Sequence, residues 1–166
     1  MATARGTTRK DAKSRQNPLL APWRTPFKAP PFKAIEPRDY KPAFDLALKT
    51  HKAEIAEIAG RKAKPTFQNT VVALEKSGAL LSKVADVFFN LTSADTNEAL
   101  QAIERQMAPR LAKHQSAILL NRKLFLRIAD LYEHRAGLDL DAEARRVLER
   151  TYKSFVRAGA RLDAKA

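Results

Sequence analysis

The sequence has no cysteine and only 5 glycines among its 166 residues. Without cysteine, the chain cannot form a disulfide-stapled scaffold, a Cys-ligated zinc site or a thiol nucleophile. No apolar run approaches the roughly 18 residues of a membrane-spanning helix, and no secretory-type apolar segment lies near Met1. With 45% hydrophobic and 30% charged residues, the composition is typical of one globular, mostly helical domain. We therefore expect a soluble, cytoplasmic protein.

Acidic residues are also scarce, with 18 against 31 basic residues, so the formal net charge is +13. Residues 1–16 carry +4 of this excess and residues 17–42 carry +3. Beyond residue 42, basic and acidic residues alternate as they do on solvated helix faces. A basic tail can contact phosphates without sequence preference, so we expect nucleic acid to bind weakly and non-specifically at most.

Composition divides the chain into three segments. Residues 1–16 are almost devoid of apolar side chains and are predicted to form a disordered basic tail, with an organelle transit peptide as the alternative. Residues 17–42 hold seven of the nine prolines and are predicted to form an extended strap, because proline removes backbone donors and blocks helix. Residues 43–166 are predicted to form a helical domain. The strap contains four interleaved aromatic residues, which we expect to anchor it onto the helices: Trp23, Phe27, Phe32 and Tyr40.

Apolar residues at spacings of three and four predict helices from residue 40 to the end of the chain. The predicted fold is all-α, an antiparallel bundle of about four to five helices. Gly60 is expected to end the first helix, and Thr66 to cap the second. A seven-residue apolar repeat places Gly78 inside the second helix, where a close neighbouring helix would explain it. Asp95 and Glu98 are predicted to form the next capping box.

Further signals divide the second half of the domain. Pro109 should kink the third helix, and Asn121 and Asp141 should cap the two helices that follow. The last helix continues through Gly159 with no closing residue, so we expect a domain truncated at its C-terminal end. Apolar residues off the main seams are predicted to form an exposed patch: Val84, Val87, Phe89, Leu91 and Leu119.

The sequence offers no set of residues for catalysis. The three histidines, His51, His114 and His134, have no zinc-type partner, and H-E-x-x-H, P-loop and G-x-S-x-G motifs do not occur. We predict no catalytic, cofactor-binding or metal-binding residue in this chain. His51 and His114 lie on apolar helix faces and are expected to be hydrogen-bonded boundary residues.

Several stretches follow one another in a recognisable order. The most specific is residues 67–78, Phe-Gln-Asn-Thr-Val-Val-Ala-Leu-Glu-Lys-Ser-Gly. The others are residues 17–20, 30–35, 40–44, 51–55, 87–91, 94–96, 119–125 and 155–160. Together they resemble the N-terminal region of bacterial peptidyl-dipeptidases of the M3 family of zinc metallopeptidases, the group of thimet oligopeptidase and oligopeptidase A.

The resemblance implies a longer parent that uses zinc to release dipeptides from the C-terminus of short peptides. Its H-E-x-x-H helix would lie far downstream, and the present segment would form part of one wall of a deep substrate channel. The expected partner is the catalytic domain of the same chain, and the segment alone should be inactive. The alternatives are a free-standing helical interaction module and a basic nucleic-acid-binding bundle.

Overall fold

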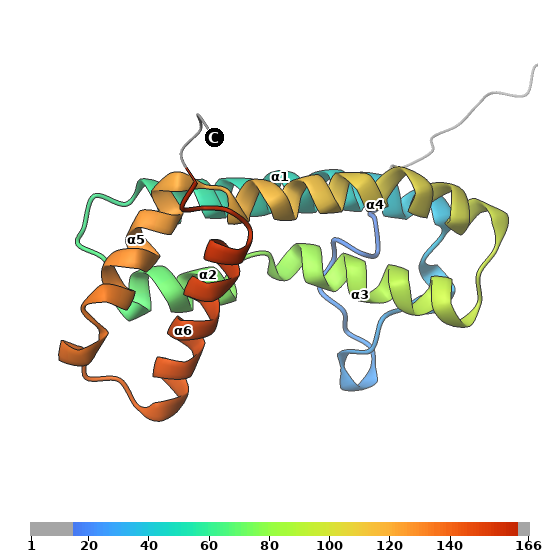
Figure 1. The fold of residues 1–166 in the computed structure, drawn as a ribbon. Helices are drawn as coiled ribbons and strands as arrows, with labels where there is room; N and C mark the ends of the chain where they lie inside the picture. The colour runs from blue at the N-terminus through green and yellow to red at the C-terminus, as the bar shows by residue number, and fades with distance from the viewer. Residues whose placement is uncertain (1–14, 163–166) are drawn as a thin grey trace, which may run out of the picture.

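The computed structural model describes residues 15–162, so most of the predicted tail lies outside the described residues. The predicted all-α class is confirmed, with no strand between residues 15 and 162. Two long helices, α1 (Pro37–Gly60) and α4 (Glu98–Leu119), lie side by side. The shorter helices lie below them in Figure 1, with α3 (Ala79–Ala94) under one half and α5 (Arg122–Glu133) and α6 (Ala142–Arg157) under the other. None of the described helices is long and apolar enough to cross a membrane.

In Figure 1, α1 runs from right to left, α3 returns from left to right and α4 again runs from right to left, so α1 and α4 are parallel neighbours. This arrangement follows from the chain path, because residues 61–78 turn the chain back into α3 and a short connection turns it again into α4. The direction is visible in the cross-helix contacts: Asp45 pairs with Arg110, and His51 meets His114 one or two turns further along both helices.

The hydrophobic core has two parts. In the strap half, residues from the strap, α3 and the first halves of α1 and α4 pack together; its buried members are Leu19, Tyr40, Ala43, Phe44, Ala47, Val84, Val87, Phe88, Leu100 and Met107. In the hairpin half, the ends of α1 and α4 pack on the α5–α6 hairpin and on residues 67–76; its buried members are Ile55, Ile58, Val71, Ile118, Leu124, Phe125, Ile128, Leu131, Leu148, Tyr152, Phe155 and Ala160.

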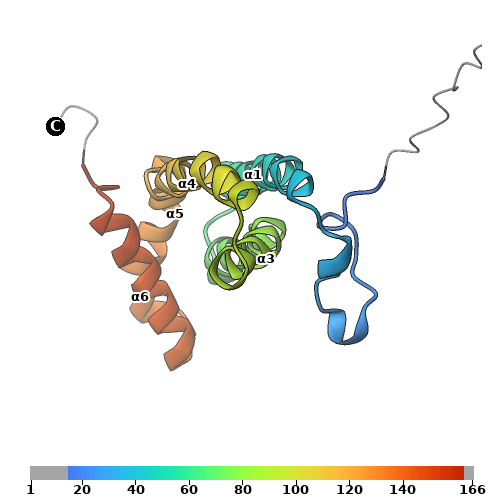
Figure 2. The same ribbon diagram turned by 90° about the vertical axis from the view of Figure 1, so that its right-hand side faces the viewer.

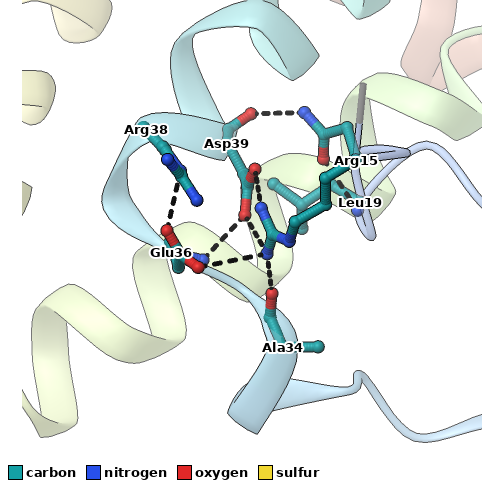
Figure 3. A network of polar contacts seen from close by, with 7 residues as sticks. Arg15, Leu19, Ala34, Glu36, Arg38 and Asp39 are labelled. Atoms are coloured by element: carbon teal, nitrogen blue, oxygen red, sulfur yellow. Dashed lines mark hydrogen bonds and ion pairs between the residues drawn. The ribbon is translucent and has the colours of Figure 1, made fainter. Parts of the chain in front are cut away.

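A polar network attaches the start of the strap to the start of α1 (Figure 3). The Arg15 guanidinium donates to both carboxylate oxygens of Asp39, at 2.8 and 3.0 Å, and also to the carbonyl oxygen of Ala34. The Asp39 carboxylate accepts in turn from the Glu36 backbone N–H at 2.8 Å, which satisfies one of the free donors at the start of α1. Burial alone would raise the pKa of Asp39, but the hydrogen bond from Arg15 and the neighbouring positive charges hold it below its ordinary value.

The strap is anchored by two of the four predicted aromatic residues, Trp23 and Tyr40, and by Leu19, which was not predicted. Leu19 is completely buried, and Trp23 is half-buried with its indole N–H donating to the Pro18 carbonyl at 2.9 Å. Phe27 is 103% exposed, at the tip of a loop that contains a short 3₁₀ turn, η1 (Pro26–Lys28), and Phe32 in the next turn, η2 (Phe32–Ala34), is 45% exposed. The anchoring prediction is therefore wrong for Phe27, because two left-handed residues, Phe27 and Lys28, direct the loop tip into solvent.

The predicted second helix is not continuous. It begins as a π-helix, η3 (Phe67–Val72), continues as α2 (Ala73–Lys76) and ends at Ser77. Gly78 then takes the left-handed conformation, with φ of 73°, before α3 begins. The prediction that Gly78 lies inside a helix is wrong, because glycine fits a helical seam in sequence but also adopts the positive φ that breaks it.

Several helix ends agree with the sequence and two do not. Thr66, Asn121 and Asp141 accept from the backbone N–H three residues ahead, as predicted, and α1 ends at Gly60. The cap of α4 is Asn97, whose side chain accepts from Leu100 N–H, so the predicted Asp95 capping box is wrong. The helix then continues through Pro109 to Leu119, and a 3₁₀ turn, η4 (Arg135–Gly137), follows α5.

The last helix does have a closing signal. Gly159 has a φ of 95°, the Ala160 N–H donates to the Phe155 carbonyl at 3.0 Å, and the Gly159 N–H donates to the Val156 carbonyl at 3.0 Å. These two bonds form a Schellman motif, which satisfies the free carbonyls at a helix C-terminus. The prediction that nothing closes this helix is therefore wrong.

The predicted exposed patch is also largely absent. Val84 and Val87 are buried in the strap half, because α3 packs on α1 and shares one core with residues of the strap and α4, and so buries a wider stripe than one seam. Leu91 and Leu119 are partly buried, and Phe89 is 37% exposed.

Candidate functional site

Two of the three histidines meet at the centre of the molecule. His51 of α1 and His114 of α4 lie with Nδ1 of His51 3.0 Å from Nε2 of His114, and their ring centroids are 4.9 Å apart. The sequence places them on apolar faces, but only the parallel register of α1 and α4 brings them together. His134 lies apart, exposed at the end of α5, where its Nδ1 is 2.8 Å from the Asp130 carbonyl.

The hydrogen-bond partners define the protonation of the pair. The Ser77 hydroxyl donates to the Leu74 carbonyl at 2.7 Å, so its oxygen is left to accept from His51 Nε2–H at 3.2 Å. Nδ1 of a neutral His51 then carries no proton and accepts from His114 Nε2–H. Only this assignment makes a donor meet an acceptor at every link.

The loop before α3 closes over the same ring. The Gly78 N–H donates to Oε2 of Glu54 at 2.7 Å, and a Cβ at Gly78 would lie 2.7 Å from Cε1 of His51. The expected close approach of a neighbouring helix is therefore present, although at a helix break. We call His51, Glu54, Ser77, Gly78 and His114 the histidine junction.

The junction disfavours a positive charge on either histidine. Burial lowers the pKa of His51, although the Glu54 carboxylate opposes the shift. Burial also lowers the pKa of His114, and the positive charges of His51 and Lys52 add to that effect. A proton on His51 Nδ1 would face the His114 N–H, so charging the pair removes a hydrogen bond.

The junction does not fit a zinc ion. Between residues 15 and 162, no three His, Cys, Asp or Glu side chains are placed to hold a metal together. His51 uses both ring nitrogens for hydrogen bonds within the protein. The junction connects three segments: α1, α4 and the break between α2 and α3. The absence of catalytic residues from this chain stays a prediction.

A groove lies on the outer side of the α1–α4 pair. It has a volume of about 680 Å³ and is lined by α1, α4 and Asn121, with no contribution from α3. Four basic side chains gather along it: Lys49, Lys52, Arg110 and Lys113. We call it the basic groove. Sequence patterning had suggested that the helical basic residues are dispersed, because alternation along each helix does not show which residues two helices bring together.

One buried cation has a structural role. Arg127 of α5 is 7% exposed and donates to the carbonyls of Arg61, at 2.8 Å, and Ala63, at 3.0 Å. It also donates to Oδ1 of Asn69 at 2.8 Å. These neutral acceptors replace water around the guanidinium, so Arg127 holds the connector between α1 and η3 against α5.

The chain is similar to bacterial peptidases. It is 42% identical over 146 residues to dipeptidyl carboxypeptidase of Escherichia coli K12, which covers 88% of this chain and 21% of that protein. The same enzyme of Salmonella typhimurium LT2 is 42% identical over 146 residues, 88% of this chain and 22% of that protein. Oligopeptidase A of E. coli K12 is 23% identical over 143 residues, 86% of this chain and 20% of that protein. No family model matches.

The resemblance found in the sequence motifs is thus confirmed at the level of dipeptidyl carboxypeptidases. The chain spans about a fifth of the length of these relatives.

Proposed function

We propose that this chain is the N-terminal, channel-wall segment of a zinc-dependent peptidyl-dipeptidase. The observation that carries the proposal is the 42% identity to dipeptidyl carboxypeptidase over 146 residues. The longer parent would act in the cytoplasm and release dipeptides from the C-terminus of short peptides. Its zinc and H-E-x-x-H helix would lie outside this chain and supply the water activation.

The shape of the fold supports a wall. The helices α1 and α4 contain 24 and 22 residues, which corresponds to lengths of about 36 and 33 Å. They are held parallel by contacts along their length, from the Asp45–Arg110 ion pair to the histidine junction and Ile118. A pair of this length and stiffness can form one side of an elongated channel for an extended peptide.

A free-standing interaction module is the second candidate, and the end of α6 favours it. The Schellman motif at Gly159 and the two buried clusters support it, because α6 is closed and the described helices bury two cores of their own. Both candidates predict that the chain alone neither retains stoichiometric zinc after dialysis nor releases dipeptides from an N-blocked peptide. A chimera is needed to distinguish them.

The decisive experiment replaces the matched segment of the E. coli dipeptidyl carboxypeptidase by residues 17–162 of this chain. We expect the chimera to bind zinc and release dipeptides, whereas a deletion of the same segment should be inactive. The matched control carries the corresponding segment of E. coli oligopeptidase A, which is only 23% identical to this chain. A chimera that is folded and zinc-loaded but releases no dipeptide would contradict the wall assignment and favour the module.

A further inference from the structure

We propose that the basic groove is a docking site for an amphipathic α-helix whose apolar stripe is flanked by acidic residues. The groove extends along α1 from Asp45 to Ala56, about 16 Å or three helical turns. In both views, α3 lies under the α1–α4 pair and no described element covers the opposite side (Figures 1 and 2). The groove therefore has the length of a short helix and is open to receive one.

The floor of the groove is apolar and shallow. Ala56 of α1 and Ala117 of α4 are exposed alanines, and half-buried Leu48 of α1 also lines the groove. Small side chains on two adjacent helices leave a depression that the side-chain ridge of a third helix can fill. An apolar stripe at spacings of three and four would cover this floor, as in other helix-in-groove complexes.

The walls carry positive charge that the described structure does not neutralise. Asp45 is the one carboxylate lining the groove, and it pairs with Arg110 at 2.6 Å and Lys41 at 3.1 Å. Lys49, Lys52 and Lys113 have no ion-pair partner among residues 15–162. Lys49 and Lys113 extend from neighbouring helices into one groove, so carboxylates flanking the ligand's apolar stripe would relieve their repulsion.

Charge and shape argue against two other occupants. A second copy of the chain in a symmetric dimer would place this groove against itself and bring lysine to lysine. A nucleic acid would neutralise the lysines, but its phosphates would leave the floor of Leu48, Ala56 and Ala117 without an apolar partner. An acidic amphipathic helix would pair its carboxylates with the lysines of the walls and cover the floor with its apolar stripe.

The experiment measures binding of a fluorescein-labelled synthetic helix to the full 166-residue chain by anisotropy at about 0.15 M salt. The probe has about 14 residues, with a leucine and alanine stripe flanked by glutamate. Two further peptides serve as controls: one with lysine in place of glutamate, and one with the same composition scrambled. We expect a Kd of about 10 µM for the probe and at least about tenfold weaker binding of both controls.

Two pairs of variants locate the site. Lys49→Glu/Lys52→Glu should weaken probe binding by about tenfold or more, whereas Arg145→Glu/Arg146→Glu, with the same charge change on α6, should leave it within about twofold. Ala117→Trp should block the floor, whereas Ala112→Trp, also exposed on α4 but outside the groove, should not. Far-UV circular dichroism confirms that each variant is folded.

Docking does not depend on peptidase activity, so failure here and failure of the chimera are separate results. Equal binding of the scrambled or lysine-flanked peptide would overturn the proposal, as would groove variants that bind as tightly as the parent chain. A single-stranded DNA of about 20 nucleotides that competes equally well, and is lost in the same variants, would show a general polyanion surface instead.

Discussion

The strap half and the hairpin half bury comparable sets of apolar residues in different ways. In the strap half, an extended segment without regular backbone hydrogen bonds lies against α1 and α3. Phe88 packs edge-on against Tyr40 and Phe44 at centroid distances of 5.0 and 5.4 Å. In the hairpin half, every buried element is a helix or helical turn except the segment after α6, and Tyr132 stacks on Tyr152 at 3.9 Å. The strap half is therefore stabilised mainly by tertiary contacts, whereas the hairpin half is also stabilised by local contacts within its helices.

This difference explains where backbone groups find partners. The hairpin helices begin at side-chain caps, Asn121 and Asp141, within three residues of the N–H groups they accept. The strap instead uses distant partners, such as Lys83 of α3, whose ammonium donates to the Ala21 carbonyl at 2.7 Å and lies 4.3 Å from the Trp23 ring centroid. Substitutions in the two halves should therefore differ in how far from the substituted residue the structure is destabilised.

The largest effect is expected from Phe88→Ala. Phe88 is fully buried between α1 and α3, so its removal should lower the free energy of unfolding by about 3–5 kcal/mol in urea denaturation. Phe155→Ala, in the hairpin half, is the matched change. If α1 and α4 couple the halves, Trp23 fluorescence and circular dichroism will report one transition in both variants. If Phe155→Ala leaves the midpoint of the Trp23 fluorescence transition unchanged, the two halves unfold as independent units.

Gly78→Ala should follow, because it strains the junction between the halves. A left-handed conformation costs a residue with a Cβ about 1–2 kcal/mol, and that Cβ would overlap His51. We expect a loss of about 2 kcal/mol or more in the free energy of unfolding. Gly60→Ala is the control, because no atom lies within 4 Å of its Cβ position. Equal effects of the two substitutions would contradict the close approach.

Lowering the pH should loosen the same junction. The folded-state pKa values of His51 and His114 lie below the ordinary histidine value of 6.5, so the unfolded state binds more protons as the pH falls through that value. The free energy of unfolding should therefore decrease from pH 7 towards pH 5. His51→Gln should flatten this slope and His134→Gln should not. If His51→Gln leaves the pH dependence of the free energy of unfolding unchanged, the histidine junction is not its cause.

Asp39→Asn tests the attachment of the strap. We expect a loss of about 1 kcal/mol, since the amide keeps the shape but loses the charge that binds the start of α1 and the Arg15 guanidinium. Because the pKa of Asp39 is lowered, its stabilisation is present above the ordinary aspartate value of 3.8 and is lost as the pH falls through the folded-state pKa. Asp45→Asn, in an exposed ion pair, should have a smaller effect on urea denaturation. A larger loss of stability in Asp45→Asn than in Asp39→Asn would contradict a stabilising role of the Asp39 network.

The smallest effect is expected from Phe27→Ala. The Phe27 ring lies fully in solvent, so the free energy of unfolding should change by no more than about 0.5 kcal/mol. Leu19→Ala, in the same strap, should cost about 2–5 kcal/mol. Thermal denaturation of both variants would show which residue anchors the strap, and a large effect at Phe27 would mean that the loop tip folds back onto the helices.

Glycine shows why the sequence predicts helices better than their breaks. Gly78 and Gly159 both fall on apolar seams with helical spacing, so the periodic pattern includes them in helices. Both have positive φ in the structure and end helical segments instead. The apolar pattern depends only on spacing along the chain. The φ angle of a glycine also depends on its tertiary neighbours, such as the His51 ring at Gly78.

The sequence by itself determined the all-α class, the end of α1 at Gly60 and the caps at Thr66, Asn121 and Asp141, because each depends on residues within a few positions. Only the tertiary structure decided which of the aromatic residues anchor the strap, and it alone formed the histidine junction and the basic groove. His51 and His114 are 63 residues apart, and their contact exists because α3 returns the chain so that α4 lies parallel to α1. The register between two such helices is set by packing of the whole core, which no local pattern contains.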